Sequence, residues 1–138
     1  MISLSPVIEL LKTKPADFDG AWFRQVSNAA QYAKDIVHAS SLPKPLAWVV
    51  RSSDDLTMEA YDFERSAVSF DVVFAVENLR TYDINNTDNN LLRYRVAVKS
   101  LLFGSNFFLE RRVQGVVVDY TDYGIFWRDR YTLKNDII

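Results

Sequence analysis

The chain has 138 residues, of which 49% are hydrophobic and 25% are charged. This length and composition predict a single domain, residues 1–138, with one hydrophobic core, and they exclude an intrinsically disordered chain. A net charge of −2 argues against broad nucleic-acid binding, which depends on an excess of basic side chains. The absence of cysteine excludes disulfides, thiolate zinc sites and cysteine-dependent catalysis.

The first residues lack the basic and apolar regions of a signal peptide, and the longest apolar runs are too short to span a bilayer. We therefore expect a protein of a reducing, aqueous compartment that does not bind membranes. A helix is predicted over residues 6–13. Ser5 can cap its start, and Pro15 disfavours its continuation. The elements expected next are a short strand, a helix and a connector, over residues 22–26, 28–37 and 40–45.

Strands dominate the middle of the sequence. A short apolar strand, a polar turn, a strand that pairs back and a longer strand are predicted over residues 46–51, 52–56, 58–64 and 66–76. In the longest of these, Val68, Phe70, Val72 and Phe74 alternate with other residues and share one face. Val73 lies on the other face, which indicates a strand that is partly covered on both sides.

An amphipathic helix over residues 91–103 is predicted to follow a polar loop over residues 82–90. Thr87 or Asp88 is the expected N-cap, and Gly104 is a natural end. A hairpin completes the chain, with strands over residues 112–120 and 125–134 and a turn at 121–124, in which Gly124 could take a positive φ. Together these elements predict an α+β fold, a mostly antiparallel β-sheet with helices packed against it.

The sequence offers little to support catalysis. His38 is the only histidine, and no acid and nucleophile stand near it, so we interpret it as a surface or half-buried side chain. Asp119 and Asp129, on the two arms of the hairpin, could form an acid–base pair. Ion pairs with neighbouring basic residues explain them more simply. The sequence therefore predicts no enzyme, although a carboxylate-based one stays an alternative.

No metal or other cofactor is expected. Residues 83–88 are partly similar to a calcium-binding loop but lack its central glycine and terminal glutamate, so a solvated loop is the better interpretation. The four glycines are isolated from one another, which excludes a phosphate-binding loop. With one histidine and no cysteine, only carboxylates are left as metal ligands, and Asp54, Asp55, Glu59 and Asp62 form a cluster of them.

Five segments carry a family resemblance: residues 45–49, 70–78, 91–103, 118–120 and 125–131. Their order and their patterns resemble those of phage tail terminator proteins of the Mu-like and lambda-like kind. The last segment also contains the Trp-x-Asp-x-aromatic pattern that similar proteins carry in their final strand.

The resemblance implies a structural protein of the virion, assembled in the host cytoplasm, with no cofactor and no reaction. Copies of the chain would form a ring, expected to be a hexamer, on the head-proximal end of the tail tube. The ring would stop tube polymerisation and join the tail to a head-completion or neck protein. The implied partners are therefore a second copy of the chain, the tail tube protein and the neck protein.

A cyclic ring needs two different patches on each subunit. We expect axial contacts and charged contacts across subunits, made by Asp54, Asp55 and Leu56 and by Arg93, Arg111 and Arg112, respectively. The alternatives are another tail or neck subunit, such as a tube or head–tail joining protein, or a small RNA- or ligand-binding module. Residues 113–120 lack the Lys/Arg-Gly-aromatic pattern of an RNA-binding strand.

Overall fold

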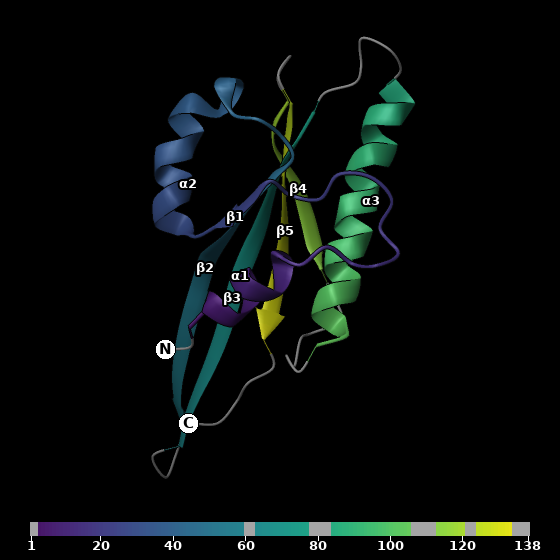
Figure 1. Ribbon diagram of the computed structural model, residues 1–138. Helices are drawn as coiled ribbons and strands as arrows, with labels where there is room; N and C mark the ends of the chain where they lie inside the picture. The colour runs from purple at the N-terminus through teal and green to yellow at the C-terminus, as the bar shows by residue number, and fades with distance from the viewer. Residues whose placement is uncertain (1–2, 60–62, 78–83, 106–112, 121–123, 134–138) are drawn as a thin grey trace.

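The computed structural model describes residues 3–59, 63–77, 84–105, 113–120 and 124–133. Within these residues three α-helices and a short 3-10 helix surround one five-stranded sheet. Figure 1 shows α2 on one side of the sheet and α3 on the other. In the described part of the chain, no helix has both the length and the apolar composition that a membrane span requires.

The sheet has the order β1-β2-β3-β5-β4. Its strands are β1 (Gln25–Ser27), β2 (Leu46–Glu59), β3 (Phe63–Val76), β4 (Gln114–Tyr120) and β5 (Ile125–Leu133). β1 is parallel to β2, and the other neighbours are antiparallel. The predicted α+β class and its mostly antiparallel sheet are therefore confirmed.

One face of the sheet packs against α1 (Ser5–Leu11) and α3 (Ile84–Phe103). Aromatic rings fill this layer. The ring centroids of Phe23 and Tyr94 lie 5.2 Å apart, and the ring of Phe70 stacks on that of Tyr131 with 5.6 Å between their centroids. The Tyr94 hydroxyl donates to the carbonyl oxygen of Ala21 at 2.7 Å. These contacts make the α3 side the larger part of the core.

The opposite face is covered by α2 (Ala29–Asp35), which continues into the 3-10 helix η1 (Ile36–Ser41). The Trp48 indole N–H donates to the Asp35 carboxylate at 2.9 Å, and the Tyr32 ring meets that indole edge-on. The buried residues of this second cluster are Leu46, Trp48, Val73, Ala75 and Phe126. The central strands are thus buried on both faces, as their apolar residues predicted.

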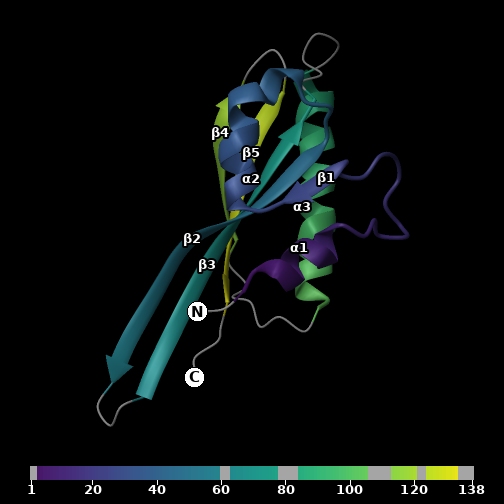
Figure 2. The ribbon, with the colours of Figure 1, turned by 60° about the vertical axis from the view of Figure 1, so that its left-hand side comes forward.

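β2 and β3 extend beyond the rest of the sheet. β3 pairs with β5 from Val76 to Val68, whereas its pairing with β2 continues as far as Phe63 and Glu59. Figure 2 shows this two-stranded ribbon projecting below the sheet, away from the helices. The predicted turn over residues 52–56 is therefore wrong, because this segment is part of one continuous strand. The polar residues there continue the strand instead of reversing the chain, and the β2–β3 ladder shifts register between Arg51 and Ser53.

The long helix begins earlier than predicted. α3 starts at Ile84, so residues 84–90 are helical and are not a loop, and neither Thr87 nor Asp88 is its N-cap. Asparagine and aspartate are only weakly unfavourable in a helix, and the buried residues Leu91 and Tyr94 anchor the turns that follow. The predicted end is confirmed, because α3 stops at Phe103 and Gly104 follows.

Other boundaries differ by a few residues. The N-cap of α1 is Leu4, which makes no side-chain cap, so the prediction of Ser5 as the cap is wrong. The predicted strand over residues 22–26 is shifted to 25–27, because Trp22 is needed in the core, where its indole donates to the Leu11 carbonyl oxygen. The predicted helix over residues 28–37 does start after Asn28, whose side chain caps α2, but its last residues belong to the 3-10 helix.

The C-terminal hairpin is confirmed as β4 and β5, although residues 121–123 of its turn lie outside the described residues. Among the described glycines, Gly20 has a positive φ, of 100°. Gly124 does not, so the prediction of a positive φ at Gly124 is wrong. Gly124 is needed for close packing instead: a Cβ there would lie 2.6 Å from the carbonyl oxygen of Val76.

Candidate functional site

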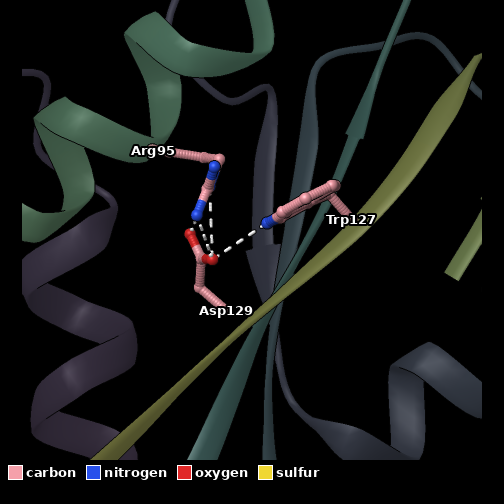
Figure 3. A network of polar contacts seen from close by, with 3 residues as sticks. All are labelled: Arg95, Trp127 and Asp129. Atoms are coloured by element: carbon pink, nitrogen blue, oxygen red, sulfur yellow. Dashed lines mark hydrogen bonds and ion pairs between the residues drawn. The ribbon is translucent and has the colours of Figure 1, made fainter. Parts of the chain in front are cut away.

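A buried carboxylate joins α3 to β5. Asp129 is 1% exposed, and its carboxylate accepts hydrogen bonds from Nε and Nη2 of Arg95, each at 2.9 Å. The Trp127 indole N–H donates to the same carboxylate at 2.9 Å, and the Arg95 guanidinium lies over the Trp127 ring. Figure 3 shows the three side chains converging. The Trp-x-Asp-x-aromatic pattern thus has a structural cause, because Trp127, Asp129 and the buried Tyr131 share the face of β5 that meets α3.

Gly115 makes room for this network. It lies opposite Asp129 in the β4–β5 ladder. A Cβ at position 115 would lie 2.6 Å from Nη2 of Arg95, 2.6 Å from Cζ2 of Trp127 and 2.7 Å from a carboxylate oxygen of Asp129. These distances are too short for a side chain, so glycine is required here by packing.

A second buried carboxylate lies on the other face of the sheet. Asp71 is 5% exposed and accepts from Nε of Arg130 at 2.9 Å, while Nε of Arg128 stands 3.6 Å away. The hydrogen bond and the negative charge of Asp71 raise the pKa of Arg130. The described residues place no second carboxylate on these two arginines, so the group carries one surplus positive charge.

These contacts bear on the carboxylate pair that the sequence offered. Asp129 is occupied by Arg95, so its interpretation as an ion-pair residue is confirmed, although the partner comes from α3 and not from the neighbouring residues of β5. Asp119 lies opposite Phe126, whereas Asp129 lies opposite Gly115, at another point of the ladder. The side chain of Asp119 lies outside the described residues.

The remaining chemical candidates are a single histidine and a group of acidic residues. His38 is exposed in the 3-10 helix, as expected. Among the described residues, no three His, Cys, Asp or Glu side chains are grouped as metal ligands would be. Asp54, Asp55 and Glu59 lie in the second half of β2, where the structure describes the backbone pairing alone, and Asp62 lies outside the described residues.

An RNA-binding platform would need exposed aromatic rings on the sheet. On the inner strands β3 and β5, the phenylalanine and tyrosine side chains whose burial is described lie beneath the helices, at 0–3% exposure. They are Phe70, Phe74, Phe126 and Tyr131. The geometry of these strands therefore disfavours base stacking.

The predicted contact residues fall in two places. Asp54, Asp55 and Leu56 pair with Val68, Ala67 and Ser66, at the point where the ribbon leaves the sheet. Arg93 lies on α3, where its guanidinium donates to the Asp19 carbonyl oxygen and to the Asn90 side chain. The guanidinium carbon also lies 5.1 Å from the centroid of the Phe18 ring. Arg111 and Arg112 lie outside the described residues.

Two exposed apolar surfaces were not predicted from the sequence. One is the run Val116, Val117 and Val118 on the edge strand β4, and the other is the outer side of α3 with Leu92 and Val96. The signal for the first was three consecutive valines in a strand. The signal for the second was a pair of apolar residues at the helical spacing i, i+4, on the side of the helix opposite the core stripe.

The buried carboxylates are held in ion pairs, and helices cover the central strands. Together with the exposed apolar surfaces, these features define a structural subunit that acts through protein–protein contacts. A family model described as phage tail terminator protein matches residues 1–138. The chain belongs to the phage tail terminator family, and the predicted resemblance is confirmed. No curated protein matches the sequence. The protein is therefore a non-enzymatic component of the phage tail, within the virion, that associates with the tail tube and caps it.

Proposed function

We propose that copies of this chain form a closed head-to-tail hexamer at the head-proximal end of the tail tube. One face of the ring stops tube polymerisation, and the other face receives a head-completion protein. The whole chain acts as one domain in this assembly, which is completed in the host cytoplasm before the tail joins the head. Family membership over residues 1–138 supports this proposal.

The observation that carries the ring is the difference between the two edges of the sheet. β1 closes one edge with three residues, and β4 closes the other with seven. Each edge strand carries backbone groups that a further strand or a neighbouring chain can satisfy. Because the two edges differ, the β4 edge of one copy can meet a different surface of the next copy, and such a head-to-tail contact closes into a ring when the rotation between copies closes.

The ribbon of β2 and β3 supplies the axial contact in this proposal. Asp54 pairs with Val68, the last residue of β3 that also pairs with β5, and Asp55 and Leu56 lie beyond it. A two-stranded ribbon alone is marginally stable in water, so it gains most from a surface that covers it. We assign that surface to the tail tube, and we place Asp54, Asp55 and Leu56 at the contact.

Charged residues contribute across the subunit boundary. Arg93 holds the segment around Asp19 in place and offers its remaining guanidinium surface to a neighbour. Arg111 and Arg112 stay proposed subunit contacts on the strength of the sequence alone. Because such rim charges steer association, the rate of ring formation should fall with salt.

The test is native mass spectrometry of the chain across a concentration series, alone and with assembled tail tubes of the same phage. A species of six copies, alone or on tubes, supports the proposed ring. A chain that stays monomeric under both conditions overturns it. Binding to the neck protein without binding to tubes would instead favour the head–tail joining alternative.

A further inference from the structure

The side of α3 that faces away from the sheet is apolar. Leu92 is 51% exposed, Val96 55% and Phe103 36%. The helix buries its other side, at Leu91, Tyr94, Val98 and Leu102. A surface helix usually turns charged or polar residues to water at such positions, so these three residues indicate a face that is covered in the assembly.

A groove runs beside this face. It has a volume of about 660 Å³ and lies between α3 and the segment that precedes β1. Its apolar lining residues are Pro15, Phe18, Leu92, Val96, Ala97 and Leu101. Two exposed carboxylates, Asp17 and Asp19, stand in its wall. Arg93 fixes that wall through its bond to the Asp19 carbonyl oxygen and its position over the Phe18 ring, so the groove is preorganised.

The edge strand β4 has a matching apolar surface. Val116, Val117 and Val118 are 47%, 49% and 42% exposed. Edge strands are normally protected by charged residues or proline, and β4 carries one charged residue, Asp119, only after its three valines. Val116 lies opposite Arg128 and Gln114 opposite Arg130, so the two arginines of β5 flank the valines.

The charges on the two surfaces are complementary. The charged residues that line the groove are Asp17, Asp19 and Arg93, and because the Arg93 guanidinium is bound to the Asp19 carbonyl oxygen, the two carboxylates leave the groove net negative. Arg128 and Arg130, beside the valine strand, share Asp71 and so carry a surplus positive charge. An apolar strand flanked by arginines therefore fits an apolar groove flanked by aspartates, and like charges would disfavour a groove-to-groove or strand-to-strand contact.

The two surfaces lie on opposite flanks of the same helix. Arg93 reaches from α3 to Asp19, on the groove side. Arg95 reaches to Asp129 on β5, and a Cβ at Gly115 of β4 would touch it. Residues two positions apart in a helix point about 200° apart, so one flank of α3 faces the groove and the other faces β4. A contact between the two surfaces joins unlike patches and propagates from copy to copy.

We infer that the β4 edge of one copy, through Val116, Val117 and Val118, docks in the α3 groove of the next copy. Arg128 and Arg130 of the strand then lie near Asp17 and Asp19 of the groove. This inference rests on the proposed ring and specifies which surfaces close it.

Because the chain has no cysteine, single introduced thiols report directly on the contact. Val96→Cys and Val117→Cys are prepared separately, mixed under conditions of assembly and treated with a short bis-maleimide. A covalent dimer should form in the mixture and not with either variant alone. The double variant V96C/V117C should give a ladder that ends at the ring size. The matched control is Val37→Cys mixed with Val117→Cys, because Val37 is 74% exposed but lies on η1, outside both surfaces.

Charge placed in the groove gives an independent measurement. Val96→Asp should raise the concentration at which half of the ring dissociates by about tenfold or more, whereas Val37→Asp should leave it unchanged. Both sites are exposed, so both variants should keep the unfolding midpoint of the parent chain.

The outcomes separate this inference from the proposed ring. Rings that form without a Val96–Val117 cross-link overturn the inference and leave the ring standing. A cross-linked dimer from Val117→Cys alone would show strand-to-strand pairing and also overturn it. A chain that remains monomeric alone and on tail tubes overturns the ring and this contact together.

Discussion

Asp71 and Asp129 lie one rung apart on the neighbouring strands β3 and β5, and their carboxylates are buried on opposite faces of the sheet. Asp129 is held by Arg95 of α3, and Asp71 is held by Arg128 and Arg130 of β5. β5 is therefore fixed from both sides. Since removal of one partner from a buried pair leaves an uncompensated charge, this region should be especially sensitive to single substitutions.

Replacement of Arg95 by alanine should lower the free energy of unfolding by about 3 kcal/mol or more, because Asp129 would stay buried and, among the described residues, would keep the Trp127 indole as its partner. Urea denaturation measures the change. Lys99→Ala, at an exposed position of the same helix, is the control and should change stability by less than about 0.5 kcal/mol. Equal effects of the two variants would show that Asp129 is solvated after all.

Gly115→Ala should destabilise the protein by about 1–3 kcal/mol, because the added methyl group would overlap Arg95, Trp127 and Asp129. Thermal unfolding followed by circular dichroism measures this loss. Val117→Ala, two positions along the same strand, shortens an exposed side chain and should be close to neutral. If Gly115→Ala proved as stable as the parent, the tight packing between β4 and α3 would be disproved.

The stability of the chain should fall at alkaline pH. Burial and the nearby Asp129 carboxylate raise the pKa of Tyr131. The folded state therefore favours the neutral phenol, and this contribution is complete below the unfolded tyrosine pKa of about 10 and is lost as the pH rises above it. In Tyr131→Phe the decline above about pH 10 should be shallower, as measured by urea unfolding at several pH values. Burial also raises the pKa of Tyr94, so part of the decline should remain; an unchanged slope would refute the assignment to Tyr131.

Removal of the ribbon should separate folding from assembly. Replacement of residues 55–67 by a short turn deletes residues that, in the described structure, pair only with each other. The unfolding midpoint should stay nearly constant, while capping of tail tubes should be lost. Electron micrographs measure capping, because capped tails have a uniform length and the variant's tails should not. The less drastic variant Leu56→Ser keeps the ribbon and tests the contact itself. Normal tails from the deletion variant would exclude the ribbon from tube binding.

The sequence was most informative where burial repeats regularly. Val72 and Phe74 alternate under α3, and the stripe of Leu91, Tyr94 and Val98 repeats at helical spacing, so β3 and the body of α3 could be predicted. Residues 52–56 could not, because their polar composition is shared by turns and by ribbons that leave the core. The start of α3 was missed for a related reason, since local preference for a loop is weak and a long buried stripe overrides it.

The functional surface was harder to predict than the fold. The resemblance identified the family through residues such as Trp127 and Asp129, which hold β5 to α3 and do not themselves form an exposed surface. Exposed contacts follow no comparable pattern. Val96 and Val117 look like core residues in the sequence, and only the packing of α3 and β4 shows that they face outward.

The position of α3 between the groove and the β4 edge has a consequence for the number of copies in the ring. If each copy receives its neighbour on one flank of this helix and offers itself on the other, the relative orientation of the two contact surfaces sets the rotation between successive copies. The number of copies is then the number of such rotations in a full turn. Substitutions that tilt α3 against β4, such as those around Gly115, would therefore change the diameter of the central opening of the ring. They would do so while the contact between neighbouring copies still forms.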